Sequence, residues 1–139
     1  MNPILTIDEL EILTPDQLGK LLLFEIHKMP KNVEHIKDLI NIGACLEVRD
    51  GENRTVIFHA MRYDLFWAID ILIQYNCNIN AVDCYGQSPL FFALLRGNNA
   101  IRLLLNAGAD VDVSNYHGET AWDIATDEIR EMFPELEPK

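Results

Sequence analysis

The stretch that decides the fold is Asp83-Cys-Tyr-Gly-Gln-Ser-Pro-Leu-Phe-Phe-Ala93, because variants of it occur on both sides of it in the chain. The preceding copy runs from Asp50 to Ala60 and the following copy from Asn115 to Ala125, so successive copies start 33 and 32 residues apart. A period of this length is typical of proteins in which one small unit stacks repeatedly along an axis. We therefore expect a repeat architecture.

Two of the copies are followed by a second apolar run that ends at a residue suited to the left-handed conformation. Ile71-Leu-Ile73 precedes Asn76, and Leu103-Leu-Leu105 precedes Gly108. One period before Asn76, an apolar run also ends at Gly43, which indicates a degenerate first unit. A left-handed residue commonly closes the last turn of a helix. Each unit is therefore predicted to contain a second helix that stops at this residue.

The first helix of each unit carries its own start signal. Thr55, Ser88 and Thr120 stand where a side-chain oxygen can accept a hydrogen bond from the first turn of a helix. Pro89 follows one of them, at the first helical position, where proline fits well. Two short helices cannot bury their apolar faces alone, so neighbouring units must stack into a solenoid with one continuous core.

These units resemble those of the ankyrin repeat family, which run D-x-x-G-x-T-P-L-H-x-A, then a second helix, then L-L-x-x-G-A-D-V-N. The residues that carry the resemblance in the third unit are Gly86, Ser88-Pro89-Leu90, Ala93, Gly97, Leu103-Leu104-Leu105 and Gly108-Ala109-Asp110-Val111. The resemblance covers roughly residues 17–133. It implies an all-α fold, an ankyrin-repeat solenoid of stacked helix-turn-helix units with short hairpin tips.

The sequence departs from the family pattern at a few positions. In the second unit Asn53 replaces the tip glycine and Val56 replaces the proline. By register His27 takes the position that Ala60 occupies in the second unit. Trp67 stands where the family usually has a polar residue, toward the convex side. It either packs under the N-terminal segment or marks a second contact surface.

We expect residues 1–13 to form an N-terminal extension and residues 14–139 to form the repeat domain, with units at approximately 14–49, 50–82, 83–114 and 115–139. The outer units are degenerate and are expected to act as caps. Thr14 with Gln17 has the pattern of a capping box, and Thr6 with Glu9 repeats it in the extension. The extension is therefore predicted to hold a short helix that folds over the first unit.

At the other end of the chain, Pro134 is expected to stop the last helix. Residues 134–139 contain little apolar surface, so their deletion is predicted to be nearly silent.

The composition excludes several classes of protein. The 139 residues include 22 acidic and 11 basic side chains, for a net charge of −11, which disfavours binding to nucleic acid or to an anionic membrane. Residues 1–16 carry −4, residues 107–139 carry −7, and the middle is neutral. The acidic ends either act as solvated caps or steer a basic partner. There is no apolar run of about 18 residues and no signal-peptide pattern, which predicts a cytoplasmic protein, monomeric when free.

We find no pattern of catalytic or metal-binding residues. The histidines, which are scattered, are His27, His35, His59 and His117, and the cysteines, at spacings that suit neither disulfides nor zinc, are Cys45, Cys77 and Cys84. Cys77 takes a small buried position of the family and is expected to be an inert thiol. Cys84 lies at a tip, with no histidine in register to activate it. We expect no enzymatic activity, no metal and no cofactor.

The resemblance implies that a partner binds the concave face, where the family varies. Carried over in register, the candidate contacts are Arg54, Arg62, Tyr63, Tyr85, Gln87, Leu95, Arg96, Tyr116, His117 and Glu119. Tyrosine and arginine are the residue types that dominate binding hot spots. We expect Tyr63, Tyr85 and Tyr116 to form a continuous aromatic stripe.

These observations predict a non-enzymatic protein-binding module. The acidity suggests an inhibitor or immunity-type protein that sequesters a basic toxin or enzyme. The alternatives are a signalling adaptor, a secreted effector that recruits a host protein, or a structural subunit of a larger complex. The salt dependence of the association rate distinguishes the inhibitor from the alternatives, because steered association of opposite charges slows as ionic strength rises.

Overall fold

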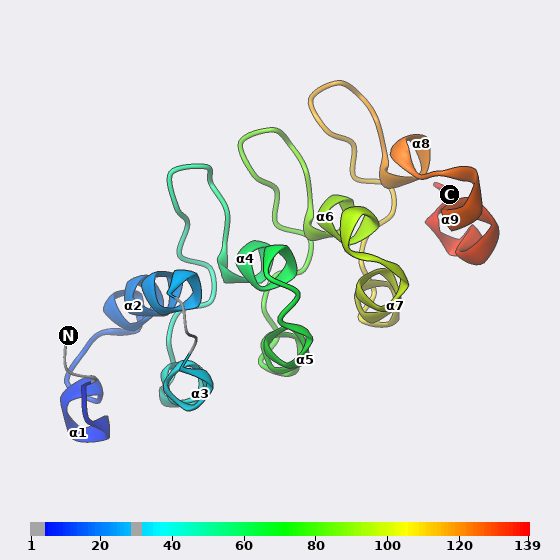
Figure 1. Ribbon diagram of the computed structural model, residues 1–139. Helices are drawn as coiled ribbons and strands as arrows, with labels where there is room; N and C mark the ends of the chain where they lie inside the picture. The colour runs from blue at the N-terminus through cyan, green and yellow to red at the C-terminus, as the bar shows by residue number, and fades with distance from the viewer. Residues whose placement is uncertain (1–4, 29–31) are drawn as a thin grey trace.

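The computed structural model describes residues 5–28 and 32–139, and its helices are arranged as a row of pairs (Figure 1). We call inner helices those that follow each hairpin or open the first unit: α2 (Pro15–His27), α4 (Val56–Arg62), α6 (Pro89–Arg96) and α8 (Ala121–Ile124). The outer helices are α3 (Val33–Ile42), α5 (Phe66–Gln74), α7 (Asn98–Asn106) and α9 (Asp127–Met132). A short helix α1 (Ile7–Leu10) precedes them, and a 3-10 turn (Pro134–Leu136) ends the stack. The all-α solenoid is thereby confirmed, and the described residues contain no β-strand.

Three hairpins project to the same side of the helices (Figure 1). Each is stabilised by its first residue, Asp50, Asp83 or Asn115. In the middle hairpin, Asp83 Oδ1 accepts hydrogen bonds from the backbone N–H groups of Tyr85, at 2.9 Å, and Gln87, at 3.0 Å. The first residues of the other two hairpins accept the same pair of bonds. The sequence repeat is therefore also a repeat of hydrogen bonding.

The departure from the family pattern at Asn53 leaves the hairpin intact. Asn53 adopts φ +60°, close to the +76° of Gly86 in the next hairpin. Asparagine is one of the few residues other than glycine that take the left-handed conformation readily. The outer helices end as predicted, because Gly43, Asn76 and Gly108 all have positive φ.

The helix starts agree with the sequence only in part. Thr14 and Gln17 form the predicted capping box, with the Gln17 amide 3.2 Å from Thr14 Oγ1. Thr120 also caps its helix. Thr55 and Ser88 occupy the predicted cap positions, but their side chains make no capping hydrogen bond, so that expectation is wrong. Both are only 1% exposed, and the hydroxyls are buried among packed side chains instead.

The core lies between inner and outer helices and continues from unit to unit. Leu90 and Leu104 are 1% and 0% exposed, so both expected core residues are confirmed. Trp67 is half-buried against the core, and Lys37 Nζ of α3 lies 6.0 Å from its ring centroid. Trp67 therefore packs beside the outer helix of the first unit.

Both ends of the stack are closed by buried side chains. At the N-terminal end, the predicted capping box of Thr6 and Glu9 opens α1, and Leu10 packs into the core at 1% exposed. At the C-terminal end, Phe133 is 2% and Leu136 0% exposed. The expectation that residues 134–139 carry little of the core is therefore wrong. Pro134 ends α9, but it also begins the 3-10 turn that brings Leu136 back onto the core.

The close approach of residues 45–48, which lead into the first hairpin, to α2 gives a stability prediction. A methyl group on Gly19 would overlap the Cys45 carbonyl oxygen and the Val48 side chain. This segment is held in place because the Cys45 N–H donates to the Pro15 carbonyl at 2.8 Å. Replacing a helical glycine with alanine ordinarily stabilises a protein by about 1 kcal/mol. We expect Gly19→Ala instead to lower the free energy of unfolding by about 1–3 kcal/mol, because the site is overpacked.

Urea denaturation followed by circular dichroism measures this change. Gly51→Ala is the control, since no atom lies within 4 Å of a methyl group there. A Gly19→Ala protein as stable as Gly51→Ala would contradict the observed packing against α2.

Candidate functional site

The concave face is the surface bounded by the hairpin tips and the inner helices (Figure 1). Several large apolar side chains are exposed on it. Tyr85 and Tyr116 at the tips are 56% and 74% exposed, and Leu95 on α6 and Ile124 on α8 are 82% and 41% exposed. Large apolar side chains gathered on one face are the usual mark of a contact surface.

The tips that carry the two tyrosines are tied to each other. The Tyr116 N–H donates to the Tyr85 carbonyl at 3.1 Å, and the Cys84 N–H donates to the Glu52 carbonyl at 2.9 Å. The Tyr116 ring lies so close to Gly86 that a methyl group there would collide with it. The tips therefore form one ordered row, which presents its side chains with little loss of conformational entropy on binding.

Tyr63 does not belong to this row, so the expected stripe of three tyrosines is wrong. Tyr63 follows the last residue of α4, whereas the hairpin leads into the first residue of that helix. Because α4 has seven residues and is about 10 Å long, Tyr63 lies at the end of the helix away from the hairpin. Tyr63 is half-buried, and its hydroxyl lies 2.9 Å from His27 Nδ1. The aromatic stripe consists of Tyr85 and Tyr116 only.

Arg54 has a structural role in this face. Its side chain is only 11% exposed, with Nε 3.2 Å from Asp83 Oδ2 and Nη1 2.9 Å from Glu52 Oε2. The guanidinium also lies 4.9 Å from the centre of the Phe92 ring. Arg54 thus joins the first two hairpins and supports Phe92 of α6, rather than presenting a free charge to a partner.

The other candidate contacts differ in how exposed they are and in whether they are paired with another side chain. Arg62 is exposed and lies 5.9 Å from the Tyr63 ring centroid. Arg96 forms a loose ion pair with Asp64 at 3.9 Å. Gln87 is half-buried, and His117 and Glu119 are exposed on the last hairpin. The accessible candidates therefore spread from the end of α4 to the tips.

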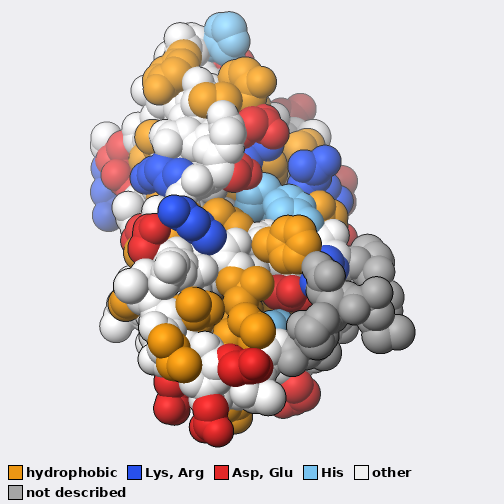
Figure 2. Space-filling view, turned by 90° about the vertical axis from the view of Figure 1, so that its left-hand side faces the viewer, with side chains coloured by type: hydrophobic (Ala, Val, Ile, Leu, Met, Phe, Trp, Pro, Cys, Tyr) orange, Lys and Arg blue, Asp and Glu red, His pale blue; other side chains and the backbone are white. Residues whose placement is uncertain are grey.

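A histidine cluster that was not predicted from the sequence lies at the start of the concave face. The rings of His27 and His59 lie 4.3 Å apart, and His59 Nε2 lies 2.6 Å from Asp50 Oδ2. Pale-blue histidine side chains adjoin one another in the middle of the N-terminal end (Figure 2). The expected equivalence of His27 and Ala60 is wrong: His27 is the exposed last residue of α2, whereas Ala60 is buried within α4.

Burial favours the neutral form of His59. It lowers the pKa of His59, and the hydrogen bond that His59 donates to Asp50 offsets only part of that effect. Burial also acts to raise the pKa of Asp50, but hydrogen bonds from the Arg54 and Glu52 amides and from His59 outweigh it and lower that pKa. The arrangement therefore favours an ionised Asp50 beside a neutral His59. The spacing of 32 residues between the two histidines, close to one repeat period, could have indicated the contact.

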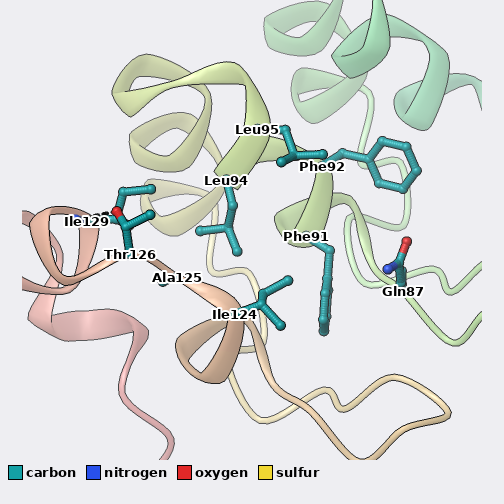
Figure 3. A pocket seen from close by; sticks show the side chains of 9 residues that line it. All are labelled: Gln87, Phe91, Phe92, Leu94, Leu95, Ile124, Ala125, Thr126 and Ile129. Atoms are coloured by element: carbon teal, nitrogen blue, oxygen red, sulfur yellow. Dashed lines mark hydrogen bonds between the residues drawn. The ribbon is translucent and has the colours of Figure 1, made fainter.

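An apolar cavity of about 320 Å³, also not predicted from the sequence, lies between the third and fourth units. Its lining residues are Gln87, Phe91, Phe92, Leu94, Leu95, Ile124, Ala125, Thr126 and Ile129 (Figure 3). The cavity arises because α8 has four residues where α6 has eight, so the second half of α6 lacks an inner-helix neighbour on the side of the fourth unit. The truncated fourth unit was the signal in the sequence that could have found it.

The described residues provide little evidence of a metal site or of a reactive cysteine. In residues 5–28 and 32–139, no three His, Cys, Asp or Glu side chains are grouped so that they could hold a metal ion. Burial raises the pKa of the Cys77 thiol to about 12, as expected of an inert cysteine, and Cys84 is exposed. Across the same residues, no helix combines the length and apolar character that crossing a bilayer requires.

Comparison with known proteins points to one family. The sequence pattern that describes three consecutive ankyrin repeats matches residues 23–115. An ankyrin repeat protein of Acanthamoeba polyphaga mimivirus is 30% identical over 128 residues, which is 87% of this chain and 17% of that protein. The B-cell lymphoma 3 protein homolog of Mus musculus is 33% identical over 98 residues, which is 68% of this chain and 22% of that protein.

A shorter match, 47% identical over 58 residues, is to a protein of Danio rerio named as a palmitoyltransferase, and it covers 40% of this chain and 9% of that protein. The chain therefore spans less than a quarter of the length of these relatives.

Proposed function

Because the chain belongs to the ankyrin repeat family, whose repeats form protein–protein interaction modules that are typically not enzymes, we propose that it binds a basic partner protein through its concave face. The observation that carries the proposal is the group of exposed apolar side chains on adjoining elements of that face: Tyr85, Tyr116, Leu95 and Ile124. A contact surface gains most from large side chains that are already held in place.

The charge supports a basic partner. The chain has a net charge of −11, and residues 107–139, which border the face at its C-terminal end, carry −7. A field of one sign raises the rate at which an oppositely charged partner arrives. An acidic module that covers the functional surface of a basic protein would block it, and we therefore favour an inhibitor or immunity-type role that sequesters a basic toxin or enzyme.

A second candidate is a recruiting module, an adaptor that brings a partner to a larger assembly. The observation that favours it is the length of the relatives, of which this chain matches less than a quarter. Salt distinguishes the two roles. Association with a sequestered basic partner should slow strongly as ionic strength rises, whereas an apolar recruiting contact should change little.

Replacing Tyr85 with alanine should weaken binding of the partner recovered from cells by about 1–3 kcal/mol, or roughly 5- to 150-fold. Tyr85 lies on the middle hairpin, where the surrounding contacts of a bound partner would exclude water. Folding should be unaffected, because the hairpin is held by backbone hydrogen bonds that the substitution keeps. Isothermal titration of the purified pair measures the affinity.

Tyr75→Ala is the matched control, since Tyr75 is 48% exposed but follows the outer helix α5. Circular dichroism checks that both variants are folded. A folded Tyr85→Ala protein that binds as tightly as Tyr75→Ala would remove the concave face from consideration.

A further inference from the structure

We propose that the cavity between α6, α8 and α9 receives one large apolar side chain of the partner, and that lysine or arginine flanks this side chain in the partner's sequence. The inference rests on the proposed function and names the chemistry that the concave face selects.

The space exists because one repeat is incomplete. Met61 of α4 is fully buried, while Leu94, one repeat period later on α6, is only half-buried. The inner helix that follows Met61 is α6, with eight residues, whereas the one that follows Leu94 is α8, which has four and ends at Ile124. The cavity of about 320 Å³ is many times the roughly 30 Å³ that a water molecule occupies in the liquid. It has room for a leucine, methionine or phenylalanine side chain.

The lining selects an apolar group. Side chains of α6, α8 and α9 surround the cavity, and of its lining residues only Gln87 and Thr126 are polar (Figure 3). A charged or amide group placed there would lose its hydration without gaining enough hydrogen bonds. An apolar side chain would complete the packing that the missing helical turns leave open.

One wall of the cavity is already rigid. The Phe92 ring stacks edge-on against Phe58, with centroids 5.4 Å apart, and Arg54 lies over it at 4.9 Å. Arg54 is in turn paired with Asp83. Because these contacts exist without a partner, binding does not have to order this wall.

The rim adds the preference for basic neighbours. Asp127 and Glu128 are exposed at the start of α9, beside the lining residues Thr126 and Ile129. Arg130 donates hydrogen bonds to the carbonyl oxygens of Trp122, at 2.8 Å, and Asp123, and its Nη1 lies 3.6 Å from Asp127 Oδ1, so it offsets part of the charge of that carboxylate. On the opposite side, Arg96 is balanced by Asp64. Lysine or arginine next to the inserted side chain would meet the carboxylate of Glu128 and, beside its loose ion pair with Arg130, that of Asp127.

Selection from a display library of random short peptides on the immobilised full chain tests the proposal. We expect the enriched peptides to share one large apolar residue with lysine or arginine near it. Leu95→Asp and Ile124→Asp should each weaken a selected peptide at least about 10-fold, because each places a charge at the cavity. Ile12→Asp is the matched control, since Ile12 is 83% exposed and lies in the N-terminal segment.

The charge requirement is tested separately. The double variant Asp127→Asn/Glu128→Gln should reduce affinity for the selected peptides several-fold at low salt, and the difference from the unmodified protein should shrink as salt is added. Enriched peptides without basic residues, or with binding unchanged in the double variant, would overturn the basic part of the proposal.

Failure to enrich any peptide, or binding that tolerates Leu95→Asp and Ile124→Asp as well as it tolerates Ile12→Asp, would overturn the apolar site. Analytical ultracentrifugation adds one further outcome: self-association lost in Leu95→Asp would assign the cavity to a second copy of this chain and also overturn the proposal. Failure here is distinct from failure of the proposed function, because the Tyr85→Ala variant and the recovered partner test the concave face without reference to this cavity.

Discussion

Replacing Leu104 with alanine should lower the free energy of unfolding by about 2–5 kcal/mol. Leu104 is fully buried in α7, where it belongs to the core shared by the third and fourth units. The substitution removes buried apolar surface and leaves a cavity that the surrounding helices cannot fill completely. An effect of this size is a large part of the total stability of a small domain.

Urea denaturation of the purified protein measures the change, and Leu95→Ala is the matched control. Both are leucines on neighbouring helices of the third unit, but Leu95 is 82% exposed. We expect the control to stay within about 0.5 kcal/mol of the unmodified protein. Equal midpoints for the two variants would contradict the assignment of Leu104 to the core.

Deleting residues 134–139 should cost a similar amount, about 2–5 kcal/mol, although the sequence alone suggests that this tail is dispensable. The deletion removes Leu136, which is fully buried, and uncovers Phe133, which is 2% exposed. In a stacked solenoid each unit is stabilised by its neighbours, so loss of the end cap should also expose the last unit to fraying. The expected signs are an earlier denaturation midpoint and a broader transition.

Deleting only residues 137–139 is the control for the tail. It keeps Leu136 and removes exposed residues, of which the Lys139 N–H donates to Asp112 at 3.0 Å. We expect this shorter deletion to have little effect. A Leu136→Ala variant separates the side chain from the backbone of the tail, and a silent result for it would mean that Leu136 does not contribute to the cap.

The sequence predicted best what depends on residues close together in the chain. The hairpin that begins at Asp83, the helix end at Gly108 and the capping box at Thr14 each involve contacts within a few residues, so local patterns carry them. The repeat period then implied that such units stack, because none of them can bury its apolar face alone. Leu104 could be assigned to the core on this basis.

By itself, then, the sequence determined the all-α repeat architecture and its family. The tertiary structure decided what happens where the repeat is broken or where different units meet. The cavity beside Leu94 depends on how early α8 stops, and the burial of Leu136 depends on where the final turn folds back. The pairing of His27 with His59, like that of Arg54 with Asp83, joins side chains about one repeat period apart. A periodic pattern describes the average unit, but these contacts depend on the departures from it, and only the packed arrangement of neighbouring units specifies them.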